Sequence, residues 1–137
     1  MGLILDSSVV IAAERLGQTA YQMLEAISQQ KQDPEIAISV VTVVELAHGI
    51  ARADTPQRRA GRQQFLDDLL AGMPVHPVTV PIALRAGQAD GQMQAAGKRM
   101  ALADLLIGST ALELGYSVAT ANLRHFALLP DLLIEQL

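Results

Sequence analysis

The sequence contains no cysteine and no tryptophan, and it has only two phenylalanines and two tyrosines. The lack of cysteine excludes disulfides and thiolate metal sites, and it fits a reducing compartment. Because aromatics are scarce, leucine, isoleucine, valine and alanine must fill the core. Apolar residues make up 50% of the 137 positions, so we expect one domain with a substantial core over residues 1–137.

Long apolar runs and positive charge are also scarce. The apolar stretch 36–44 is far shorter than the roughly 20 residues that span a bilayer, so we expect no membrane segment. The N-terminus has no basic segment followed by a long apolar run, which excludes an ordinary secretory signal. A net charge of −4 argues against binding nucleic acid over the whole surface, although a local basic patch remains compatible with it. We expect a soluble, cytoplasmic protein.

Short apolar segments alternate with longer amphipathic ones along the whole chain. The short segments predict strands at 3–5, 36–39, 74–80, 116–120 and 132–135, the third weakened by its prolines. The longer segments predict helices at 9–15, 19–29, 42–52, 56–71, 82–96 and 100–115. This alternation is typical of an α/β fold with a small, mostly parallel sheet covered by helices on both faces.

Three acidic residues, Asp6, Glu45 and Asp104, stand inside apolar segments. Each has a structural explanation. Asp6 is placed to cap a helix, Glu45 has capping-box spacing from Thr42, and Asp104 lies near a helix start, where its charge suits the dipole. All three, however, follow a strand or open a helix, and in a parallel sheet those points share one edge, where open α/β sheets place their ligands.

Three carboxylates gathered at one edge would repel each other by about 4 kcal/mol per pair at about 4 Å with an effective dielectric near 20. A cation that neutralises them, or protonation of some of them, would allow such a cluster to persist. Ligands that are all oxygen suit Mg²⁺ or Mn²⁺, ions that keep several waters and often bind phosphate. The three acids therefore indicate a metal-dependent enzyme that acts on phosphate.

Four segments in this order resemble PIN-domain ribonucleases, and more narrowly the VapC toxins of bacterial toxin–antitoxin pairs. They are LILDSSVVIAAER, ISVVTVVELAHGI, LADLLIGSTALELGYSVATANLRHF and LPDLLI. The resemblance covers nearly the whole chain and implies a PIN-like α/β/α sandwich. It also implies a Mg²⁺- or Mn²⁺-dependent endoribonuclease whose metal-activated water cleaves RNA to leave a 5′-phosphate and a 3′-hydroxyl.

The resemblance assigns roles by position. Asp6 and Asp104 are the expected metal ligands, and Glu45 is a weaker ligand that orients or deprotonates the attacking water. Thr120 supports the site through its hydroxyl. Asn122 stands where many PIN domains carry a further acid, so the number of metal ions stays open.

Basic residues near the acids are candidates for contacting RNA, although they also suit a solvated helix surface that pairs with Asp54 or Asp67. These candidates are Arg52, Arg58, Arg59, Arg62, Lys98, Arg99, Arg124 and His125. The resemblance further implies a homodimer and a VapB-like antitoxin that presents a basic side chain to the carboxylates. Apolar positions on two helices, including Val44 and Leu84, are candidates for the dimer face.

Three other classes share part of this pattern, but the first two lack acids that they require. A haloacid-dehalogenase-like phosphatase needs a second Asp two residues after the first, where this chain has Ser8. A receiver domain needs acids adjacent to Asp6 and a further Asp after a middle strand, which the chain lacks. A degenerate PIN domain that binds RNA or a protein without cleaving is kept open by Asn122.

Overall fold

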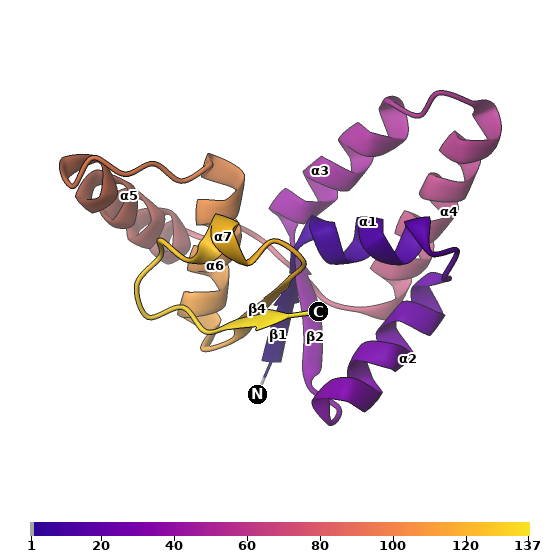
Figure 1. Cartoon of the computed structure of the whole chain (residues 1–137), viewed down its shortest axis with the longest axis horizontal. Helices are drawn as coiled ribbons and strands as arrows, with labels where there is room; N and C mark the ends of the chain where they lie inside the picture. The colour runs from indigo at the N-terminus through magenta and orange to yellow at the C-terminus, as the bar shows by residue number, and fades with distance from the viewer. Residues whose placement is uncertain (1) are drawn as a thin grey trace.

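Five short strands pair in parallel at the centre of the computed structural model, which describes residues 2–137 (Figure 1). The strands are β1 (Gly2–Leu5), β2 (Glu35–Ser39), β3 (Val75–His76), β4 (Ser117–Thr120) and β5 (Ile134–Gln136), in the spatial order β3-β2-β1-β4-β5. The α/β class and the parallel sheet predicted from the sequence are therefore confirmed.

Along the part of the chain that the structure describes, seven helices lie around this sheet. They are α1 (Ser7–Arg15), α2 (Ala20–Lys31), α3 (Val40–Ala51), α4 (Pro56–Gly72), α5 (Val80–Ala95), α6 (Leu102–Leu114) and α7 (Leu123–Phe126). Figure 1 shows α1, α2 and α4 on one side of the sheet, and α5, α6 and α7 on the other. Helices α3 and α4 run beside each other as a hairpin that extends away from the sheet.

Alternate residues of β1 supply the two halves of the core. Leu3 and Leu5 pack in one cluster with residues of α1, α2 and α4, whereas Ile4 packs in the other with residues of α6 and α7. This follows from the two-residue period of a strand, which sends successive side chains to opposite faces. Every residue of β1 is buried because helices cover both faces of the sheet.

Several predicted boundaries were wrong for identifiable reasons. Helix α1 begins at Ser7 rather than residue 9, and α3 begins at Val40 rather than residue 42, because capping positions directly follow the strands. The expected strand at 74–80 shrinks to Val75–His76, with proline on either side, since proline has no N–H for a ladder. The short helix α7 was not predicted. Within residues 2–137, no helix is long and apolar enough to cross a membrane.

Candidate active site

Asp6 lies at the carboxyl end of β1, where the residue is 3% exposed. Its backbone occupies the N-cap position of α1, but its side chain makes no capping hydrogen bond, so the capping explanation was wrong. Instead, Oδ2 of Asp6 accepts hydrogen bonds from the hydroxyls of Ser8, at 2.7 Å, and Thr120, at 3.0 Å. The buried carboxylate is thus oriented by side chains from α1 and from the end of β4.

Glu45 lies in α3, beyond its first turn. The predicted capping box was wrong, because Ser39 rather than Thr42 is the N-cap residue of that helix. Oε1 of Glu45 is buried and has no hydrogen-bond partner within residues 2–137. Burial raises the pKa of the Glu45 carboxyl, the Ser7 hydroxyl opposes this rise, and the charges of Asp6 and Asp104 add to it.

Asp104 lies in the first turn of α6, as the sequence predicted, and its side chain is largely buried. Burial is the main cause that raises the pKa of this carboxyl, and the charge of Asp6 raises it further. His125 of α7 lowers it, since its Nδ1 lies 3.7 Å from Oδ2 of Asp104. Asp104 therefore interacts electrostatically with Asp6 and with the exposed imidazole of His125.

The three predicted acids, from α3, α6 and the end of β1, lie near enough for their charges to raise one another's pKa: those of Asp6 and Asp104 act on Glu45, and that of Asp6 acts on Asp104. Within residues 2–137, no three acidic or imidazole side chains stand close enough to form a ready metal cage. The residues nevertheless fit Mg²⁺ or Mn²⁺. These ions bind through one or two carboxylates and keep several waters, and the partnerless Oε1 of Glu45 is a free oxygen donor at the same place.

Thr120 and Asn122 lie where β4 leaves the sheet. Thr120 is fully buried, and besides donating to Asp6 it accepts a hydrogen bond from the backbone N–H of Asn122 at 2.9 Å. Asn122 is exposed and precedes α7 without capping it through its side chain. The structure therefore gives Thr120 a direct contact with an acid, whereas Asn122 contributes a backbone contact.

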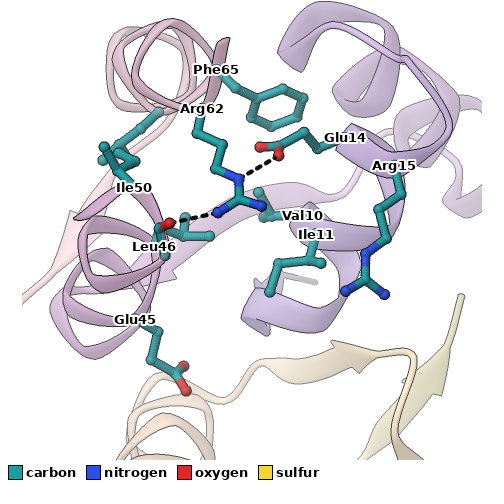
Figure 2. A pocket seen from close by; sticks show the side chains of 11 residues that line it. Val10, Ile11, Glu14, Arg15, Glu45, Leu46, Ile50, Arg62 and Phe65 are labelled. Atoms are coloured by element: carbon teal, nitrogen blue, oxygen red, sulfur yellow. Dashed lines mark hydrogen bonds and ion pairs between the residues drawn. The ribbon is translucent and has the colours of Figure 1, made fainter. Parts of the chain in front are cut away.

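A cavity of about 220 Å³ opens beside Glu45 between α1, α3 and α4 (Figure 2). Apolar side chains line much of it, including Ile11, Leu46 and Phe65. Arg62 reaches across the cavity, where its guanidinium lies 3.3 Å from Glu14 and donates to the backbone carbonyl of Gly49 at 2.6 Å. The cavity is thus an apolar groove with Glu45 of the acidic site in its lining.

The basic candidates divide into two groups. Three arginines of α4 make contacts within the chain: Arg58 pairs with Asp54 at 2.8 Å, Arg59 donates to the carbonyl of Ala53, and Arg62 makes the contacts described above. The other candidates are exposed: Arg52, which follows α3, Lys98 and Arg99 before α6, and Arg124 and His125 in α7. Of the predicted pairings, Arg58 with Asp54 was right, whereas Arg62 pairs with Glu14.

Sequence reasoning did not assign a site role to Ser8, although its hydroxyl contacts Asp6 directly. The spacing of the two residues could have indicated this contact, because a hydroxyl two positions after an aspartate at a helix start can reach back to it. His48 is exposed on α3, and His76 is half-buried in β3, where its ring meets Tyr116 edge-on.

Comparison with known proteins places the chain in a family. The chain matches the PIN domain over residues 3–131, and it belongs to that family. Ribonuclease VapC10 of Mycobacterium tuberculosis is 35% identical over 130 residues, which cover 95% of this chain and 90% of the relative. The resemblance drawn from the sequence is thus confirmed.

Solved structures agree on the fold. VapBC2 from Rickettsia felis, crystallised with a DNA fragment from its promoter, superimposes with a TM-score of 0.84 at 22% identity, covering 100% of this chain and 99% of that one. VapBC from Salmonella typhimurium, also bound to DNA, gives a TM-score of 0.81 at 22% identity, with coverage of 99% and 98%.

Proposed function

We propose that this protein is a Mg²⁺- or Mn²⁺-dependent endoribonuclease, the toxin of a VapBC-type pair. The observation that carries the proposal is the placement of three acids from separate segments: buried Asp6 directly after β1, Glu45 of α3 with a buried and unpartnered oxygen, and Asp104 in the first turn of α6. Membership of the PIN family and the curated relatives named ribonuclease VapC support the substrate class.

The three acids divide the work in this proposal. Asp6 and Asp104 hold the ion. A divalent ion, when bound, lowers the pKa of water and polarises the scissile phosphate. Glu45 orients the attacking water and accepts its proton, a role that suits a half-buried carboxylate with a raised pKa. Because water rather than the ribose 2′-hydroxyl attacks, the products carry a 5′-phosphate and a 3′-hydroxyl.

The proposal is tested by incubating the purified protein with RNA in Mg²⁺, in Mn²⁺ and in chelator. Cleavage that requires the ion and leaves 5′-phosphates, as read by sequencing of RNA 5′ ends, supports it. If the folded protein binds RNA without cleaving it, the alternative of a catalytically degenerate PIN domain is favoured. Asn122, which stands where many PIN domains have an acid, is the reason for that alternative.

The proposed partner is a VapB-like antitoxin in the cavity beside Glu45. The two solved structures named above are of VapBC, and in this chain an apolar groove leads to an acidic site. An antitoxin segment with apolar side chains and one basic group would match that surface, since a guanidinium can take the place of the ion's charge. The toxin assignment fails if the adjacent gene encodes no such partner and expression does not harm the host.

We also propose a homodimer formed through α3 and α5. Val44 is 67% exposed and Leu84 is 62% exposed, although both are large apolar residues. The other candidates, Val43, Leu46 and Met93, pack against the core, so fewer apolar residues are available for a dimer interface than the sequence suggested. Light scattering at micromolar concentration should give the mass of a dimer. Val44→Glu should shift it toward the monomer, whereas Leu70→Glu on α4 should not.

A further inference from the structure

Two hydroxyls converge on a single oxygen of Asp6. Ser8 Oγ donates to Oδ2 at 2.7 Å and Thr120 Oγ1 donates to the same atom at 3.0 Å, while the two hydroxyl oxygens lie 3.2 Å apart. Among the hydrogen bonds of residues 2–137, none reaches Oδ1 of Asp6. The two oxygens of this carboxylate are therefore chemically different before any ligand arrives.

The same hydroxyls hold the loop that follows β4. The backbone N–H of Ala121 donates to Ser8 Oγ at 3.0 Å, and that of Asn122 donates to Thr120 Oγ1 at 2.9 Å. A hydroxyl that accepts from a backbone amide keeps its own proton for another acceptor, here the carboxylate. The loop toward Arg124 and His125 is thus tied to Asp6 through two short chains of hydrogen bonds.

We propose that Ser8 and Thr120 are positioning residues that clamp Oδ2 of Asp6, so that only Oδ1 is offered to a divalent ion. This inference rests on the proposed metal-dependent function and goes beyond it, because it concerns the choice of ion. Mg²⁺ is small and octahedral and accepts single carboxylate oxygens, whereas Ca²⁺ often takes both oxygens of one carboxylate. A clamped Asp6 therefore selects the smaller ion.

Ser8→Ala removes one arm of the clamp, and isothermal titration of Mg²⁺, Mn²⁺ and Ca²⁺ into the metal-free protein measures the result. We expect Mg²⁺ affinity to fall by about 10- to 100-fold, as for other residues that orient metal ligands. Ca²⁺ affinity should fall less or rise, so the preference for Mg²⁺ over Ca²⁺ should shrink. Ser8→Thr keeps the hydroxyl and should restore the preference, while Ser28→Ala on α2 controls for loss of a hydroxyl elsewhere.

A second readout needs no metal. In chelator, the amide of Ala121 should exchange its hydrogen faster in Ser8→Ala than in Ser8→Thr, because its acceptor is gone. If Ser8→Ala does not fold, Thr120→Val gives the same test from the other arm, with faster exchange expected at Asn122.

The outcomes separate this inference from the proposed function. A folded wild-type protein that binds neither Mg²⁺ nor Mn²⁺ would overturn the metal-dependent function and the clamp with it. A wild-type protein that binds Mg²⁺, together with an unchanged ion preference in Ser8→Ala, would overturn the clamp alone.

Discussion

The Nδ1 atom of His125 lies 3.7 Å from Oδ2 of Asp104, so α7 places an imidazole beside an acid of α6. This proximity lowers the pKa of Asp104 against the larger opposing effect of burial. His125→Ala should therefore raise the pKa of Asp104 further. Carboxyl ¹³C NMR titration of the metal-free protein measures this change, and His48→Ala on the exposed surface of α3 is the matched control. An Asp104 titration that is the same in all three proteins would rule out the charge interaction.

The raised pKa values of Glu45 and Asp104 predict how metal-free stability depends on pH. The folded state holds protons on these groups more tightly than the unfolded chain does, so they favour folding most below their ordinary pKa values. Their contribution is lost as pH rises from about 4 through the raised folded values. Urea unfolding in chelator, compared between wild type and Asp104→Asn, isolates this effect. The variant should lose less stability over that window, and added Mg²⁺ should flatten the wild-type curve. Parallel curves for the two proteins would contradict the prediction.

Much of the fold followed from the sequence because strand and helix periods are local properties. For the same reason Asp6 could be placed after a strand and Asp104 at a helix start, whereas Glu45 lies beyond the first turn of α3. The contacts could not be predicted in this way. The hydroxyls of Ser8 and Thr120 are in contact although the residues are 112 positions apart in the sequence. Arg62 forms its ion pair with Glu14 rather than Asp67. Both contacts arise because tertiary packing brings α1 close to β4 and to α4. Side-chain partners depend on that packing, whereas the order of elements does not.

Asp104→Asn and Glu45→Gln should separate ion binding from proton transfer. Asp104→Asn removes the charge of a proposed ligand with little change of shape, so cleavage and Mg²⁺ binding should both be lost while the fold remains. Without metal it should unfold at higher urea than wild type, since like-charge repulsion is relieved.

Glu45→Gln should lower the cleavage rate by about 10²- to 10⁴-fold, as expected for loss of a general base, with a smaller effect on ion affinity. Rates at saturating metal together with calorimetric ion affinities measure the two effects. Full activity of Asp6→Asn or Asp104→Asn at limiting metal would remove the basis of the proposed site.

The pairing of the arginines in α4 predicts which basic residues contact RNA. Lys98→Ala and Arg99→Ala should each weaken RNA binding and reduce the dependence of log K on log salt by about 0.7, the value for one phosphate contact on a single strand. Arg58→Ala should change the slope little, because Asp54 already pairs with that guanidinium. Salt titrations of RNA binding in chelator, with Asp104→Asn as the cleavage-deficient background, measure these slopes. A larger slope change for Arg58 than for Arg99 would place the RNA on the α3–α4 side instead.

Asn122→Asp tests the departure of this chain from the usual PIN pattern. The backbone of Asn122 is fixed by its bond to Thr120, and its exposed side chain has room for a carboxylate. If the missing acid limits ion binding, the substitution should raise cleavage at low metal concentration and shift the metal dependence of the rate to lower values. At saturating metal the rate should change little, because Asp6, Glu45 and Asp104 are unaltered. Asn122→Ser, which adds no charge, is the control for loss of the amide. Equal metal dependence in wild type and Asn122→Asp would show that the position does not limit ion binding, and would favour chemistry with the one ion assigned above to Asp6 and Asp104.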